Sequence, residues 1–107
     1  MRVLLDECVD ERLRHSFTEH DCETARFAGL AGLKNGALLV AAERAGFDVI
    51  VTVDQNIPDQ QNLSDRSISI VILSGPTNRL VDLKPLVAAA LECLKSLGRG
   101  QVAVIRA

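Results

Sequence analysis

Aromatic side chains are almost absent from this sequence of 107 residues, which has three phenylalanines and neither tryptophan nor tyrosine. Domains of the RRM or OB type stack single-stranded bases on exposed rings, so this composition argues against them. A surplus of positive charge is also lacking, since the formal net charge is −2 at pH 7. Any contact with nucleic acid therefore has to be local, for example through a metal ion.

Paired cysteines and long apolar runs are missing as well. The three cysteines are odd in number and have no CxxC spacing, which argues against a disulfide framework or a zinc site and fits a reducing cytosol. No apolar run approaches the ~20 residues of a transmembrane helix, and the N-terminus lacks a signal-peptide core. We therefore expect a cytoplasmic protein with no membrane partner and a single domain over residues 1–107.

The chain does contain an alternation of strand-like and helix-like segments. Short apolar runs predict strands at residues 2–5, 22–25, 49–53, 67–73 and 101–105. Helical spacing and cap residues predict helices at residues 11–17, 37–45, 58–63 and 79–97. Asp10 and Asn35 are expected N-caps, Gly46 and Gly98 are expected ends, and Pro85 marks a kink or a second start. This alternation predicts an α/β three-layer sandwich with a central, mostly parallel sheet of about five strands.

Two aspartates follow strands that we expect to be neighbours. Right-handed crossovers place strand 2–5 between the second and third strands, which creates a topological switch point where ligands bind. Asp6 ends the first strand, Asp54 follows the β-branched run of the third, and adjacent strands lie ~4.8 Å apart. Thr52 should share the face of Asp54. Other candidates at this edge are Glu7, Lys34, Asn35, Asn56 and Asp59.

Clustered carboxylates repel one another, so this pair needs a cation or shared protons. A hard divalent ion held by one or two carboxylates plus water would satisfy it, and such an ion promotes phosphodiester cleavage. Structural alternatives stay open: Asp6 could accept loop amides, Asp54 could cap the following turn, and Asn35 could cap its helix. His15 and His20 are expected at the opposite edge, with structural roles.

Three stretches of the sequence resemble the small PIN-like domain family, compact relatives of the PIN nucleases of bacterial toxin–antitoxin pairs. They are MRVLLDECVDERL, GLKNGALLVAAERAGFDVIVTVD and QNIPDQQNL, within residues 1–74. The resemblance implies a Mg²⁺- or Mn²⁺-dependent ribonuclease that acts as a toxin on RNA and is silenced by a cognate antitoxin protein. It assigns the metal to Asp6 and Asp54, and Thr52 matches the hydroxyl residue of the family motif.

The roles expected of the remaining candidates follow from this assignment. Glu7 or Asn35 would assist the metal, Thr52 and Asn56 would orient water, and Lys34 would contact a substrate phosphate. One departure is that relatives carry an acidic residue near positions 35 and 37, where this chain has Asn35 and Ala37.

Two other functions stay open. The missing acid favours a PIN-like module that binds a protein or nucleic acid without cleaving it. A phospho-accepting receiver domain would also use acids after the first strand, Asp54 and a hydroxyl such as Ser74, but needs a lysine where Arg106 stands. The apolar last strand predicts a possible homodimer.

Overall fold

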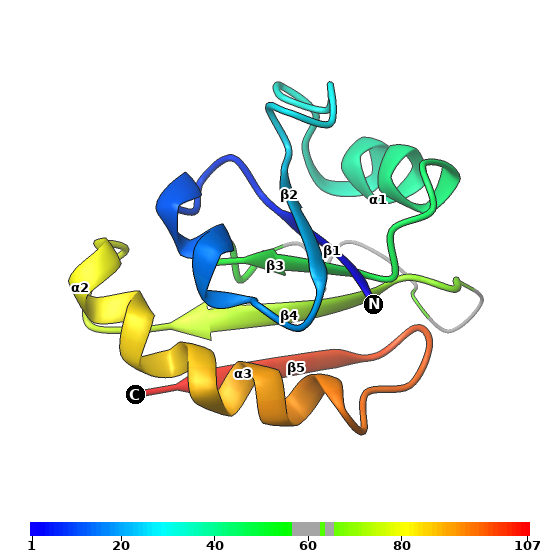
Figure 1. Cartoon of the computed structure of the whole chain (residues 1–107). Helices are drawn as coiled ribbons and strands as arrows, with labels where there is room; N and C mark the ends of the chain where they lie inside the picture. The colour runs from blue at the N-terminus through cyan, green and yellow to red at the C-terminus, as the bar shows by residue number, and fades with distance from the viewer. Residues whose placement is uncertain (57–62, 64–65) are drawn as a thin grey trace.

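Five short strands form a single sheet in which every neighbouring pair is parallel (Figure 1). The computed structural model describes residues 1–56, 63 and 66–107, so the helix predicted from Pro58 on, and Asp59, lie outside it. The strand order is β2-β1-β3-β4-β5, with β1 between β2 and β3 as predicted. The strands are β1 Arg2–Leu5, β2 Asp21–Thr24, β3 Val49–Thr52, β4 Ser69–Ser74 and β5 Val102–Arg106.

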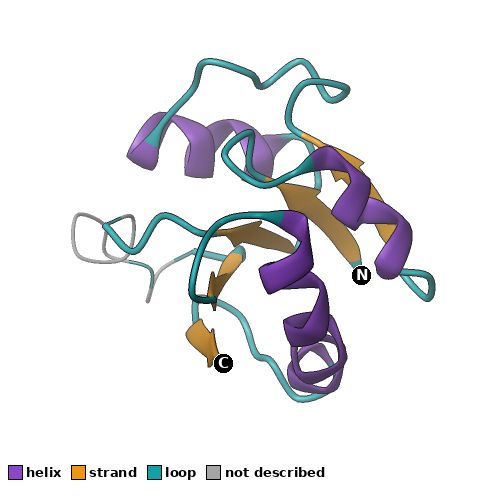
Figure 2. Cartoon of the chain, turned by 90° about the vertical axis from the view of Figure 1, so that its left-hand side faces the viewer, coloured by secondary structure: helices purple, strands orange, loops and turns teal. Residues whose placement is uncertain are grey.

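Helices cover both faces of this sheet and give the expected three-layer α/β sandwich. Figure 2 looks onto the edge at which the strands end, with α1 on one side of the sheet and the other helices on the opposite side. The helical segments are η1 Glu11–Ser16, α1 Asn35–Arg44, α2 Leu80–Leu83, η3 Lys84–Leu86 and α3 Val87–Leu94. Within the described residues, no helix has both the length and the apolar composition needed to cross a bilayer.

Two hydrophobic clusters separate on the two faces because side chains alternate along each strand. Val49 and Val51 of β3 pack under η1 and α3, whereas Ile50 between them packs under α1. All four residues of β3 are buried, which explains its uninterrupted run of β-branched side chains. The sheet therefore holds the C-terminal ends of β1 and β3 rigidly side by side.

Three helical predictions differ from the structure. The predicted helix at 11–17 is a 3₁₀ turn, capped by Asp10 as expected. The segment 79–97 divides into α2, η3 and α3, because Pro85 has no N–H to donate, and it ends at Leu94 before reaching Gly98. Asn35 is the first helical residue of α1, since Lys34 before it still has the extended backbone of an N-cap.

Candidate functional site

A hollow of about 340 Å³ lies where β1 and β3 end, and we call it the acidic hollow. Its polar lining consists of three carboxylates, one ammonium group, a thiol and an amide, and its walls are Leu33 and Val53. The polar residues are Asp6, Glu7, Cys8, Lys34, Asp54 and Asn78. The negative charges outnumber the positive one, so the hollow favours a cation.

Asp6 is the most deeply placed acid of the acidic hollow, with 8% of its surface exposed. Its Oδ1 accepts the Glu7 N–H at 2.8 Å, and its Oδ2 accepts the Thr52 hydroxyl at 2.8 Å. The Cys8 thiol also donates to Oδ2, at 3.4 Å. A carboxylate has about four acceptor positions, so these three donors leave it limited capacity for another partner.

Thr52 connects the two aspartates through one hydroxyl group. The residue is fully buried at the end of β3; its Oγ1 donates to Asp6 and accepts the Asp54 N–H at 3.0 Å. We expected Thr52 to orient water, but its buried hydroxyl is bonded on both sides and instead positions the Asp6 carboxylate and the backbone at Asp54.

Asp54 lies just beyond β3 and is half-buried. Its Oδ1 accepts the Asn56 N–H at 2.9 Å, so the turn-capping alternative is realised while the side chain still lines the acidic hollow. Asn56 itself is exposed, and its backbone rather than its amide makes this contact.

Glu7 lines the acidic hollow although the alternation of β1 would direct it to the other face. The alternation does not apply to Glu7, because β1 ends at Leu5. The Glu7 Oε1 accepts the Gly32 N–H at 3.0 Å, which ties the loop before α1 to the edge of the sheet.

Lys34, just before α1, lines the acidic hollow and places a cation beside the carboxylates. The side chain of Asn35, a predicted ligand, lies outside what the structure describes. Ala37 is exposed on α1, and Glu43 at the other end of that helix accepts the Ser67 N–H at 2.8 Å. Among the described residues, α1 therefore contributes no acidic side chain to the acidic hollow.

Sequence reasoning missed two residues of the acidic hollow, Cys8 and Asn78. Burial raises the pKa of the Cys8 thiol, and the charge of Asp6 adds to the rise, so Cys8 remains a neutral donor at pH 7. The signal for Asn78 was available, because it follows β4 at the same edge as Asp54 follows β3. A free cysteine is usually a small buried hydrophobe. Cys8 differs, because the residue as a whole is exposed and its thiol is partly buried in the acidic hollow.

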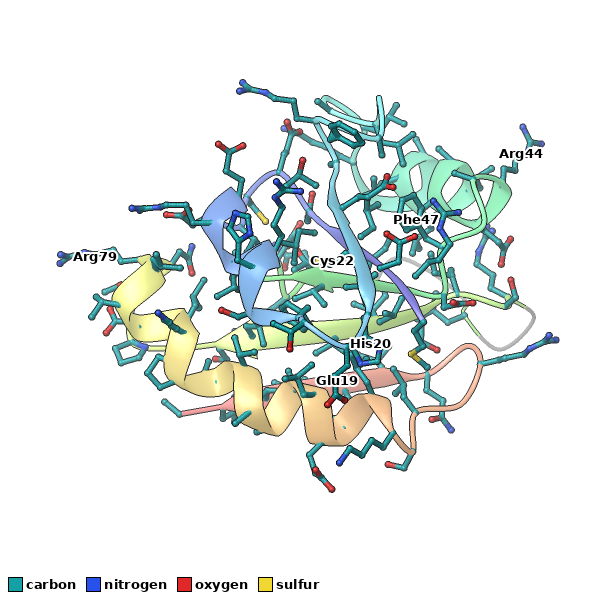
Figure 3. All side chains as sticks on the ribbon, viewed as in Figure 1. Glu19, His20, Cys22, Arg44, Phe47 and Arg79 are labelled. Atoms are coloured by element: carbon teal, nitrogen blue, oxygen red, sulfur yellow. The ribbon has the colours of Figure 1, made fainter. Side chains whose placement is uncertain are left out.

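The two histidines occupy different edges of the sheet. His20 lies at the turn into β2 (Figure 3), with its Nδ1 3.4 Å from the Met1 amino group, at the edge predicted for it. The prediction for His15 is wrong: it shares a hollow with Thr24, the last residue of β2, and with Arg26. The cause is the packing of η1 against β2, which brings His15 towards the strand's end.

Asp6 and Asp54 are the residues that could hold a divalent ion. Within residues 1–56, 63 and 66–107, no group of three or more His, Cys, Asp or Glu side chains is arranged to bind a metal. Mg²⁺ needs only one or two carboxylates when water and substrate phosphates complete its shell, and two carboxylates of one hollow fit that minimum.

Comparison with family models, curated proteins and solved structures finds no match to this chain.

Proposed function

We propose that this protein is a metal-dependent endoribonuclease of the small PIN-like type and the toxin of a bacterial toxin–antitoxin pair. The observation that carries the proposal is that Asp6 and Asp54 line one hollow at the switch point of the sheet and are joined through the Thr52 hydroxyl. In this proposal the protein acts in the cytoplasm, binds Mg²⁺ or Mn²⁺, cleaves RNA and is silenced by a cognate antitoxin protein.

The chemistry of the proposed site follows from its charges. The bound ion would supply Lewis-acid stabilisation of the charge that develops on the phosphate. Asp6 and Asp54 would hold it, with Asp6 oriented by Thr52 and Cys8. Lys34 would contact a phosphate of the substrate from the wall of the same hollow. Water would attack the phosphorus in line, and the 3′-oxygen would leave.

A second candidate is a PIN-like module that binds its partner without cleavage. It is favoured by the hydrogen bonds that already occupy the Asp6 carboxylate, because they limit how tightly that group can bind an ion. It is also favoured by the sequence, which has Asn35 and Ala37 where relatives have an acid. In either case, β5 at the edge of the sheet, with Val102 and Val104 exposed, is the surface we propose for a homodimer.

A receiver domain is the third candidate, since the strand order 2-1-3-4-5 also occurs in doubly wound folds of that class. Ser74 ends β4 as a receiver requires, but Arg106 pairs with it in β5 where a lysine would be needed. Incubation with acetyl phosphate followed by mass measurement tests it: a phosphoryl group on Asp54 would revive the receiver, and an unmodified Asp54 removes it.

The deciding experiment compares wild type with Asp54→Asn and with Asp21→Asn, an exposed aspartate at the start of β2. We expect wild type to bind Mn²⁺ by calorimetry and to cut RNA, and Asp54→Asn to cut at least about a hundredfold more slowly. Asp21→Asn should retain full activity. If the protein binds no Mn²⁺ at millimolar concentration, the non-cutting module becomes the supported function. If Asp54→Asn cuts RNA as fast as wild type, the acidic hollow is excluded as the active site.

A further inference from the structure

A second hollow of about 330 Å³, which we call the basic hollow, lies near the acidic one on the same side of the molecule. Its floor and walls come from η1 and from the segment that follows β2. Its lining is dominated by three arginines, a histidine and a phenylalanine, namely Arg12, Arg14, Arg26, His15 and Phe27. Glu11 and Thr24 complete it.

The basic and acidic hollows are joined by a third, which we call the middle hollow. It has a volume of about 340 Å³ and shares Asp6 and Glu7 with the acidic hollow. It shares Glu11, Thr24 and Arg26 with the basic hollow. The three hollows therefore lie next to one another, in a row from the end of β3, past β1, to the end of β2.

Two of the arginines in the basic hollow retain their full charge for a ligand. Arg12 is neutralised by Asp10, whose carboxylate it contacts at 2.7 Å. Within the described part of the chain, Arg14 and Arg26 form neither an ion pair nor a side-chain hydrogen bond with another residue. Both are exposed, so two guanidinium groups face one end of the row while carboxylates line the other.

Phe27 is the aromatic ring that this chain leaves in solvent. It is 77% exposed, whereas Phe17 and Phe47 are buried. The loop is held in place because the Phe27 N–H donates to the Thr24 hydroxyl at 3.1 Å. An exposed ring beside two unpaired guanidinium groups offers a face for a planar base and charges for phosphates.

We propose that the basic hollow binds one end of a single nucleic-acid strand whose other end reaches the acidic hollow. Arg14 and Arg26 hold its phosphates and Phe27 stacks one base, several nucleotides from the scissile bond. This inference rests on the proposed nuclease function for the direction of the strand. Folded duplex would not offer an unstacked base to Phe27, so the ligand is single-stranded RNA.

An acidic peptide is the competing occupant of the same charges. It would use Arg14 and Arg26 equally well, but it has no planar group for Phe27. The contribution of Phe27 therefore distinguishes the two ligands.

The test measures binding of a labelled single-stranded RNA of about ten nucleotides, within the range of known single-strand sites, by fluorescence anisotropy in EDTA. In EDTA no cleavage occurs, and the acidic hollow is identical in every variant compared. The double variant Arg14→Gln/Arg26→Gln removes two phosphate contacts. Its control is Arg44→Gln/Arg99→Gln; Arg44 projects into solvent from the far end of α1 (Figure 3). Circular dichroism verifies that each variant is folded.

We expect the Arg14/Arg26 variant to bind at least about tenfold more weakly and to reduce the slope of log K against log salt by about 1.4, or about 0.7 for each lost contact. The control should bind like wild type. Phe27→Ala should weaken binding by about 5- to 150-fold, the range for loss of one stacked base, and Phe27→Tyr should restore it. Equal effects of the two double variants would overturn the proposal. So would a poly-glutamate peptide that competes as well as RNA and ignores Phe27→Ala.

Failure of this inference can be separated from failure of the proposed function. Cleavage that depends on Asp54, combined with RNA binding that is indifferent to Arg14, Arg26 and Phe27, would retain the nuclease and remove the strand site. Binding that depends on these three residues, combined with no cleavage in Mn²⁺, would retain the strand site on a non-cutting module.

Discussion

At the residue scale, Thr52 determines how the acidic hollow is held together. Its hydroxyl is shared between the Asp6 carboxylate and the Asp54 N–H, and no water is needed to complete either bond. Removal of this one oxygen would leave a buried carboxylate short of a donor and a backbone N–H without its acceptor. The cost of such unsatisfied groups exceeds the net value of the bonds themselves.

Thr52→Val removes the hydroxyl with little change of volume, and we expect a loss of about 1–3 kcal/mol in the free energy of unfolding. Thr52→Ser is the matched control, because it keeps the oxygen and loses one methyl group worth about 0.8 kcal/mol. Urea unfolding monitored by circular dichroism measures both. A serine variant less stable than the valine variant would contradict the positioning role of the hydroxyl.

Asp10 gives the fold a dependence on acid pH. Its carboxylate accepts hydrogen bonds from the side chain and the backbone N–H of Arg12, which lowers the pKa of Asp10 to about 2. Because the folded pKa is below the unfolded value of about 3.9, the stabilisation is complete above about pH 4 and is lost as the pH falls through 2.

The variant Asp10→Asn isolates this titration, since asparagine can still cap η1 but carries no charge. The stability difference between wild type and variant should be constant near neutral pH and shrink between about pH 4 and the folded pKa of about 2. Urea unfolding across this range measures it. A difference that does not change with pH would mean that the ion pair with Arg12 adds nothing.

Residue types and strand ends were enough to predict Asp6, Asp54 and Lys34 at one edge, and the structure brings these three to the acidic hollow. The hydrogen-bond pattern could not be predicted, because it depends on where β1 stops. The position of Glu7 depends on this strand end as well. Cys8 was overlooked because a free cysteine is usually a small buried hydrophobe.

At the element scale, the connection from α3 to β5 depends on Gly100. Its φ is +63°, and a Cβ at this position would overlap the carbonyl oxygen of Leu63. Gly29 has a similar φ of +78° but nothing within 4 Å of its Cβ position. The two glycines therefore share the backbone requirement and differ in the space around them.

This pair separates the cost of conformation from the cost of contact. Gly29→Ala should lose about 1–2 kcal/mol of stability from the left-handed backbone alone. Gly100→Ala should lose a further 1–3 kcal/mol or so, because backbone must move to admit the methyl group. Thermal and urea unfolding of both variants checks the difference. Equal losses of stability would show that the Leu63 carbonyl moves aside without a measurable change in the free energy of unfolding.

The elements were predictable to different degrees. The central strands β1, β3 and β4 were recognised because runs buried on both faces are mostly apolar, and the predicted ends of the strands differ from the observed ends by at most two residues. The helical pattern over 79–97 was recognised as helical, but its division depended on how the chain accommodates Pro85. The 3₁₀ form of residues 11–16 had no signal in the apolar spacing.

At the scale of the whole molecule, the sheet divides the core into two independent halves. Val87 on α3 belongs to one cluster and Ile70 on β4 to the other. Val71 next to Ile70 faces the same side as Val87. Substitutions on opposite sides should therefore act separately.

Ile70→Val should cost about 0.5–1.5 kcal/mol and Val87→Ala about 1–3 kcal/mol in stability. Their effects should add to within about 0.5 kcal/mol in the double variant, whereas Val71→Ala combined with Val87→Ala, both in one cluster, should deviate from additivity by more. Denaturant unfolding of the single and double variants provides the test. Strong coupling across the sheet would contradict a division into two halves.

The strand order also determines how the chain can assemble as it is synthesised. β2 joins one side of β1, β3 joins the other, and β4 and β5 are then added in turn to the open edge. No strand has to enter between two that are already paired. Asp6 and Asp54 both precede β4, so these two carboxylates of the acidic hollow can meet while the C-terminal half is still being made. The helices α2 and α3, which complete the hydrophobic cluster that contains Val49 and Val51, are made later. The early arrangement of the two aspartates becomes stable only when α3 packs on that cluster.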